Sequence, residues 1–116
     1  MSRDETTLLD IATAARLVLV FVQGLDKEDF LADIKTQSSV LYQLLVVGEA
    51  VKRLSREFRA QHSEIPWSLI AGMRDQLIHA YDVVDWDEVW KTVSSDVPAL
   101  LAAIESLLPS EPTASP

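Results

Sequence analysis

The chain has 116 residues, of which 48% are apolar, and its ten basic and eighteen acidic side chains give a net charge of −8. That charge argues against tight, non-specific binding to nucleic acid, which depends on neutralising phosphates, but it leaves room for a local basic patch. The chain has no cysteine, no apolar run of roughly 18 residues and no basic lead into an apolar signal segment. Disulfides, a thiolate metal site and a membrane span are therefore excluded, and we expect one cytoplasmic domain.

Apolar side chains recur at helical spacing from the start of the chain. Residues 3–23 form the first predicted helix, which Gly24 ends because glycine adopts the left-handed conformation at little cost. Asp26 is then placed to cap a short second helix with the sequence KEDFLADI.

The third predicted helix is apolar on nearly every side. Thr36 or Ser38 would cap it, and we expect it to run to about Arg59. A helix of this kind is normally buried all round, which a small bundle cannot achieve alone, so we expect a homodimer with a close helix crossing at Gly48. Glu49 either finds a partner among these apolar neighbours or points along an edge that faces solvent.

Two further helices are predicted in the second half. Pro66 suits the first turn of the fourth helix, which carries the stretch MRDQLIHAY. Asp85 followed by Glu88 is a capping pattern for the fifth. Pro98 falls inside that last helix and either kinks it or restarts it, with Asp96 as the new cap.

No segment alternates between apolar and polar residues for long enough to predict a sheet. The small, polar tail PSEPTASP, residues 109–116, is predicted to be disordered. Residues 1–108 are therefore predicted to form an all-α domain, an antiparallel four- to five-helix up-and-down bundle.

The stretch MRDQLIHAY concentrates chemistry-bearing side chains. At about 100° per residue, one stripe faces the core and consists of Ile70, Met73, Leu77, Ala80 and Val84. Arg74 and Tyr81 share one flank of that stripe, while Asp75, His79 and Asp82 cover the opposite face. His79 is then either a solvated surface histidine or an imidazole held by the carboxylate one turn before it.

Arginine and histidine together suit metal-independent cleavage of RNA. Histidine can move a proton near neutral pH, and arginine can stabilise charge on phosphoryl oxygens. On one straight helix Arg74 and His79 diverge by about 140°, so a kink, or a cleft shared by two subunits, is needed to bring them together.

Several blocks resemble the HepT-like toxins of the all-helical HEPN superfamily. GMRDQLIHAY resembles their R-x4-H-x-Y signature, and FLADIKTQSSVLYQLLVVGEAVKRL, HSEIPWSLIAGMRDQLIHAY and VVDWDEVWKTVSSDVPAL resemble consecutive blocks of the same family. The resemblance covers roughly residues 8–108, and the order of the blocks makes it far more specific than the signature alone.

The resemblance implies a homodimeric ribonuclease toxin without metal or other cofactor, partnered by an MntA-type nucleotidyltransferase antitoxin. By carry-over, Arg74 and His79 are the catalytic pair, Asp75 supports them, and Tyr81 is the tyrosine to which the antitoxin transfers AMP. This sequence departs from the family pattern at Asp75, where asparagine is common, and at Ala80, where glycine is common. An acidic Asp75 would repel a substrate phosphate, so the level of activity stays open.

Basic, acidic and aromatic clusters elsewhere each have two interpretations. Lys52, Arg56 and Arg59 form either a solvated basic face or a patch for RNA or the antitoxin. The acidic residues Asp82, Asp85, Asp87 and Glu88 are better explained by helix capping than by a metal site. Trp86 and Trp90 suit core packing better than base stacking, and His62 is expected to be a surface residue.

The leading hypothesis is a metal-independent endoribonuclease, the toxin of a type II/VII-like toxin–antitoxin pair. The alternative is a non-catalytic HEPN scaffold, or a substrate-binding subunit of a two-component nucleotidyltransferase. RNA cleavage by the unmodified protein distinguishes the two.

Overall fold

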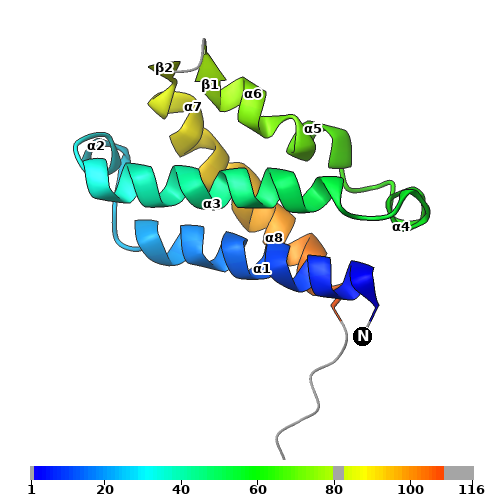
Figure 1. Ribbon diagram of the computed structural model, residues 1–116. Helices are drawn as coiled ribbons and strands as arrows, with labels where there is room; N and C mark the ends of the chain where they lie inside the picture. Colours follow the sequence, from blue (N-terminus) through cyan, green and yellow to red (C-terminus); the bar gives the residue numbers. More distant parts are fainter. Residues whose placement is uncertain (1, 80–82, 109–116) are drawn as a thin grey trace, which may run out of the picture.

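The computed structural model is built mainly of helices (Figure 1). It describes residues 2–79 and 83–108, with the backbone alone at Arg74, Asp75, Ile78 and His79. In chain order the elements are α1 (Arg3–Val22), α2 (Lys27–Leu31), α3 (Ile34–Lys52), α4 (Arg56–Gln61), α5 (Trp67–Ala71), α6 (Met73–Leu77), β1 (Ile78–His79), β2 (Val83–Val84), α7 (Trp86–Lys91), the π-helical turn η1 (Thr92–Asp96) and α8 (Val97–Glu105). The predicted helical class is confirmed, but several predicted helices are divided. The predicted tail, residues 109–116, lies outside the described residues.

Local capping explains where the first helices begin and end. Gly24, with φ of 81°, lies just after α1, as predicted. Asp26 caps α2 with a reciprocal pair of hydrogen bonds to Asp29, also as predicted. The predicted cap of α3 was wrong, because Asp33 accepts hydrogen bonds from the backbone N–H and the hydroxyl of Thr36, at 3.1 and 2.6 Å. Because the Asp33 carboxylate accepts both bonds, Asp33 is the cap, and α3 begins at Ile34 rather than after Thr36.

The predicted third helix ends before Arg59. Ser55 interrupts it by capping α4, since its hydroxyl oxygen accepts from the backbone N–H of Phe58 at 3.1 Å. Asp4 holds Ser55 in place from α1, accepting from its backbone N–H at 2.9 Å and from its hydroxyl at 2.7 Å. A contact between residues far apart in the sequence therefore decides where α3 stops.

The long helices α1 and α3 lie side by side and run antiparallel, and the α7–η1–α8 segment crosses them obliquely (Figure 1). Their facing sides form two adjoining core clusters. One centres on Ile11, Val51 and Ile104, and the other on Phe30 and Val89. In the part of the chain that is described, no helix has the length and apolarity to cross a membrane.

Gly48 packs within the chain rather than between subunits. A Cβ added there would lie 3.6 Å from the carbonyl oxygen of Ile70 and 3.8 Å from that of Ala71, both in α5. The close approach predicted for a subunit crossing is therefore between α3 and α5 of the same chain. Glu49 is half exposed and pairs with Lys52 at 3.3 Å, which agrees with the solvent-edge interpretation.

Pro98 lies in the first turn of α8, directly after the π-helical turn. Proline has no N–H, and its ring clashes with the carbonyl four residues earlier in a regular helix. A wider turn before it relieves that clash and keeps the helical path continuous. Asp96 makes no capping bond through its side chain and has helical backbone angles, so the prediction of Asp96 as a cap was wrong.

Candidate functional site

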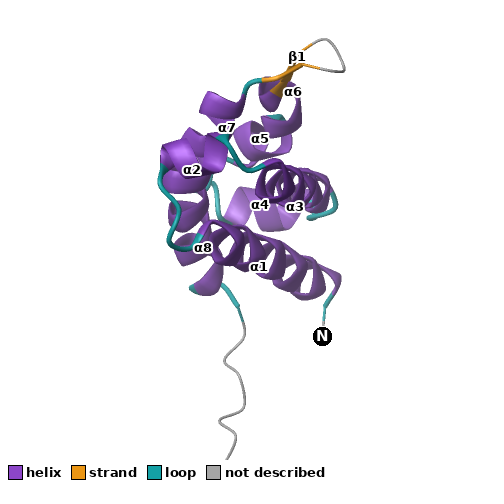
Figure 2. Ribbon diagram, turned by 90° about the vertical axis from the view of Figure 1, so that its left-hand side faces the viewer, coloured by secondary structure: helices purple, strands orange, loops and turns teal. Residues whose placement is uncertain are grey.

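The RDQLIH stretch lies where a helix gives way to a hairpin. The backbone of Arg74 and Asp75 belongs to α6, and His79 lies in β1. The two strands pair antiparallel, with Ile78 opposite Val84 and His79 opposite Val83. Figure 2 shows this hairpin at one end of the molecule, beyond α6 and α7.

The predicted single helix through MRDQLIHAY was wrong beyond Leu77. Isoleucine and valine favour extended backbone, and the N–H of Asp85 donates to the carbonyl of Leu77 at 3.1 Å, which closes the base of the hairpin. Arg74 and His79 therefore belong to different elements, so the divergence of about 140° calculated for one helix does not apply. Tyr81 and Asp82 lie outside the described residues.

The apolar side chains of the stretch anchor it to the core. Leu77 is 2% exposed in the cluster around Phe30, and Val84 packs against the same cluster from the far side of the hairpin. Met73 contacts both core clusters, and Ile70 packs against the other one. The predicted core stripe is confirmed at Ile70, Met73 and Leu77. Val84 also packs against the core, but from β2 rather than from the predicted helix, and Ala80 is outside the described residues.

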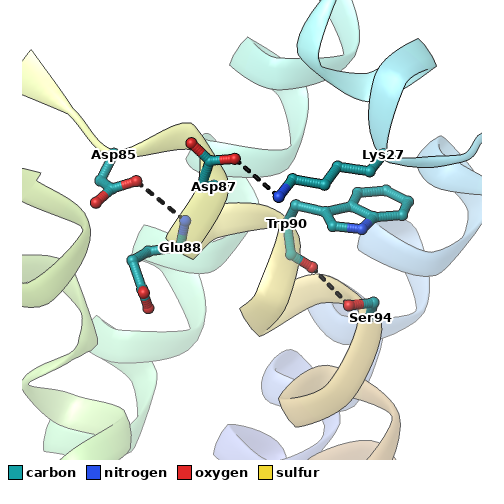
Figure 3. Close-up of polar contacts among 6 residues, drawn as sticks. All are labelled: Lys27, Asp85, Asp87, Glu88, Trp90 and Ser94. Carbon is teal, nitrogen blue, oxygen red and sulfur yellow. Dashed lines mark hydrogen bonds and ion pairs between the residues drawn. The ribbon is translucent and has the colours of Figure 1, made fainter.

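Polar contacts cap the first turn of α7 and join this helix to α2 (Figure 3). The Asp85 carboxylate accepts from the backbone N–H of Glu88 at 3.1 Å, and Asp87 pairs with Lys27 of α2 at 2.9 Å. The capping interpretation of Asp85 is confirmed. Among the described residues, no three acidic or histidine side chains lie close enough to hold a metal ion.

Aromatic packing ties the same region together. The ring of Phe30 lies 6.2 Å from Trp86, edge to face, and 5.3 Å from Trp90, measured between ring centroids. Both tryptophans pack against the core cluster around Phe30. The prediction of core packing rather than base stacking is confirmed.

The predicted basic patch is divided. Lys52 pairs with Glu49, whereas Arg56 and Arg59 line a cavity of about 410 Å³ between α4 and α5. We call it the basic hollow; it is also lined by Ser63, Trp67 and Ser68. Sequence reasoning missed these other lining residues, because they come from a loop and the next helix rather than from the helical face that carries the arginines.

His62 has partners that the sequence did not reveal. Its imidazole lies 4.5 Å from the ring of Phe58, between centroids, and 3.7 Å from the carboxylate of Glu64. Its carbonyl accepts from the indole N–H of Trp67 at 3.0 Å. The side chain is 27% exposed, so the expectation of a simple surface residue was wrong. Phe58, four residues earlier, was the available signal.

An apolar groove of about 480 Å³ runs beside the site. We define it by Leu69, Ile70 and Met73 on one wall and by Val97, Leu100 and Ala103 on the other, so it separates α5 and α6 from α8. Gln76 of α6 also lines it, two residues after Arg74 in the sequence. Leu69 is 63% exposed, which leaves a large apolar side chain at the mouth of the groove.

Comparisons with known proteins identify the family of the chain. A family model described as "Ribonuclease HepT-like" matches residues 11–107. The chain is 47% identical over 100 residues to "Probable ribonuclease HepT" of Thermococcus cleftensis, covering 86% of this chain and 91% of that protein. It is 41% identical over 90 residues to "Putative RNase TTE0752" of Caldanaerobacter subterraneus, covering 78% and 80%. No solved structure gives a significant match. The chain belongs to the HepT-like family of ribonucleases.

Proposed function

We propose that this protein is a metal-independent endoribonuclease and the toxin of a toxin–antitoxin pair, with Arg74 and His79 as its catalytic groups. The observation that carries the proposal is the family match over residues 11–107, which includes the whole R-x4-H-x-Y signature. Further support comes from the fold, in which buried Leu77 and partly buried Val84 anchor the helix-to-hairpin junction that bears this signature. Asp75, which follows Arg74 in α6, is the supporting residue of this pair.

The chemistry uses the ribose itself as the nucleophile. The 2′-oxygen attacks the adjacent phosphorus, the bond from phosphorus to the 5′-oxygen breaks, and a cyclic phosphate and a 5′-hydroxyl result. His79 moves the proton, either from the 2′-hydroxyl or to the leaving oxygen, because an imidazole titrates near neutral pH. Arg74 stabilises the negative charge that builds on the phosphoryl oxygens.

We propose that the active form is a homodimer whose two copies share one cleft. The apolar groove is the support for this assembly, because it leaves Leu69 and other apolar side chains uncovered directly beside α6. A second copy seated there would bring α6 of one subunit close to the other subunit. Exclusion of water from that cleft would lower the local dielectric constant and so strengthen the interaction of Arg74 with the scissile phosphate.

Cleavage of RNA in the presence of EDTA tests the catalytic assignment. His79→Ala or Arg74→Ala should reduce cleavage by at least about a hundredfold, the usual contribution of one acid–base or charge-stabilising group. Lys35→Ala is the control, because Lys35 is an exposed cation of α3 that lines neither the apolar groove nor the cavity between α4 and α5, so its loss should leave the rate nearly unchanged. Equal cleavage by the purified His79→Ala protein would remove the nuclease assignment. The non-catalytic scaffold would then become the leading account.

We further propose that an MntA-type nucleotidyltransferase silences the toxin by attaching AMP to Tyr81. The added phosphate would place negative charge next to the signature that holds the substrate phosphate. Intact mass after co-expression with the partner should show a gain of one or more AMP units. The gain should vanish in Tyr81→Phe and persist in Tyr42→Phe, which alters the other tyrosine of the chain, itself 64% exposed. A gain that follows Tyr42 would contradict the assignment.

A further inference from the structure

We propose that the basic hollow is a phosphate-binding subsite for single-stranded RNA, separate from Arg74 and His79. It would hold the backbone of the substrate a few nucleotides away from the bond that is cut. The idea rests on the proposed ribonuclease function for its substrate class, but the site is argued from residues that play no part in the catalytic proposal.

The charge of the hollow is opposite to that of the whole molecule. Arg56 and Arg59 line it, and none of its lining residues is acidic, in a chain of net charge −8. The neighbouring cations are already neutralised, since Lys52 pairs with Glu49 and Arg53 pairs with Asp10 at 3.8 Å. Within residues 2–79 and 83–108, neither Arg56 nor Arg59 has an ion-pair partner. Two unneutralised guanidinium groups at one cavity favour an anion there.

Arg59 is held in an unusual way. Its Nε is buried and finds no hydrogen-bond acceptor among the described residues. A buried N–H donor without an acceptor destabilises the folded chain, because it has lost its hydrogen bond to water, so this feature needs a physical explanation. An anion bound by the outer nitrogens of the same guanidinium would offset that cost by charge. Ser63 and Ser68 add two hydroxyl donors to the same cavity.

The shape of the hollow suits a nucleotide better than a small free anion. Its volume of about 410 Å³ exceeds what a phosphate needs, and an apolar wall of Ile65, Pro66 and Trp67 lines the same cavity as the arginines. Single-stranded nucleic acid offers both chemistries, with a charged backbone and flat apolar bases. A free anion would leave the apolar wall without a partner.

The position of the hollow relates it to the signature helix. Ile65, Pro66 and Leu69 line both the basic hollow and the apolar groove, so the two concavities adjoin, and the groove continues to Met73 and Gln76 of α6. Helices α5 and α6 follow one another from α4 toward the hairpin (Figure 1). At 1.5 Å per residue they extend roughly 15 Å, a span of a few nucleotides. An RNA strand that leaves the active site beside α6 and α5, outside the groove that a second copy would cover, would therefore reach the hollow.

The test measures RNA binding as a function of salt. The probe is a fluorescent single-stranded RNA of about 12 nucleotides, within the site sizes of single-strand-binding folds, and all proteins carry His79→Ala so that the probe stays intact. Arg56→Gln with Arg59→Gln should weaken binding about tenfold and reduce the slope of log affinity against log salt by about 1.4, which is 0.7 for each lost phosphate contact. Arg56→Gln alone, at an exposed position, should reduce the slope by about 0.7; this single variant guards against misfolding of the double one.

The matched control is Lys52→Gln with Arg53→Gln. It removes the same charge from the adjoining segment, but from side chains that are paired and lie outside the hollow, so its slope should stay near that of the parent. An unchanged slope in the Arg56 and Arg59 variants, or an equal fall in the control, would overturn the subsite. Equal competition by an aspartate-rich peptide of the same charge would also overturn it and would favour a protein partner.

The nuclease proposal and the subsite can fail separately. If the protein with intact His79 cuts no RNA but the slope falls as stated, the subsite stands and the nuclease assignment fails. If it cuts RNA and the arginine variants keep the parental slope, the nuclease assignment stands and the subsite fails. In the active background, the subsite also requires KM for the long RNA to rise in the double variant while the cleavage rate of a dinucleotide is unchanged.

Discussion

At the scale of single residues, the Asp4 carboxylate joins the start of α1 to the start of α4. Hydrogen bonds from the backbone N–H of Ser55, and to a smaller extent from its hydroxyl, lower the pKa of Asp4 from its ordinary value of 3.8. The hydroxyl and the backbone N–H of Thr36 likewise lower the pKa of Asp33. A carboxyl whose pKa is lower in the folded chain stabilises the fold above its unfolded pKa and loses that contribution as the pH falls through the folded value. Both groups therefore act in the same direction and weaken the fold in acid.

Asp4→Asn should lower the free energy of unfolding by about 1 kcal/mol at neutral pH, because an amide loses the charge-assisted bonds to Ser55. The difference from the parent should begin to shrink as the pH falls below 3.8, where the unfolded chain takes up the proton first, and it should be smallest below the lower folded pKa, where Asp4 is protonated in the folded chain too. Urea unfolding at neutral and acidic pH measures both. Asp10→Asn is the control, because Asp10 makes only an exposed pair with Arg53, worth about 0.5 kcal/mol or less. A pH-independent effect of Asp4→Asn would contradict the argument.

At the scale of elements, the signature depends on short segments that cannot be stable alone. Helices α5 and α6 have five residues each, and the hairpin strands have two. Isolated helices of this length are unstable in water, so they hold their shape by packing. Gly48 provides the surface against which α5 lies, with the Ile70 carbonyl at van der Waals distance from where a Cβ would be. The position of α6, and of the residues it carries, follows from that contact.

Two substitutions at Gly48 should act in opposite directions. Gly48→Ala should raise stability by up to about 1 kcal/mol, because a Cβ at 3.6 Å fits and alanine favours the helix. Gly48→Leu should lower it by about 1–3 kcal/mol, since the further carbons would push α5 away, and RNA cleavage should fall with it. Thermal unfolding and the cleavage rate measure both effects.

Gly24→Ala is the informative contrast to Gly48→Ala. The chemical change is the same, but φ of 81° at Gly24 makes any side chain unfavourable by about 1 kcal/mol. Stabilisation at Gly24, or destabilisation by alanine at Gly48, would show that backbone conformation and space do not govern these two sites as described.

At the scale of the whole molecule, the apolar groove is the feature that a second copy would cover. Ala99 and Ala102 are both exposed on α8, but only Ala99 lines the groove. Ala99→Glu should therefore weaken dimerisation by about 2 kcal/mol or more, roughly thirtyfold in Kd, because it buries an unpaired charge. Ala102→Glu adds the same charge outside the groove and should leave the dimer intact. Sedimentation across a dilution series measures the dimer Kd of the parent and of both variants. A monomeric parent, or the same Kd in both variants, would contradict the proposed assembly.

Local chemistry in the sequence was enough to predict much of the framework. Gly24, Asp26 and Asp85 marked helix ends correctly, because a cap or a left-handed residue acts on backbone groups within four positions of itself. The core stripe from Ile70 to Leu77 was correct for the same reason, since helical periodicity is a local property. The ordered motifs also identified the family, which the comparisons confirm.

Only the tertiary structure decided where the regular pattern breaks. Asp4 and Ser55, 51 positions apart, end the third predicted helix, and pairing of β1 with β2 ends the fourth at Leu77. Gly48 faces α5 rather than another subunit, and Arg56 and Arg59 meet Ser63 and Ser68 in one hollow. A helical wheel relates only residues of one helix, whereas each of these contacts joins separate segments. Their energies depend on the positions of distant groups in space, which periodicity along the chain does not contain.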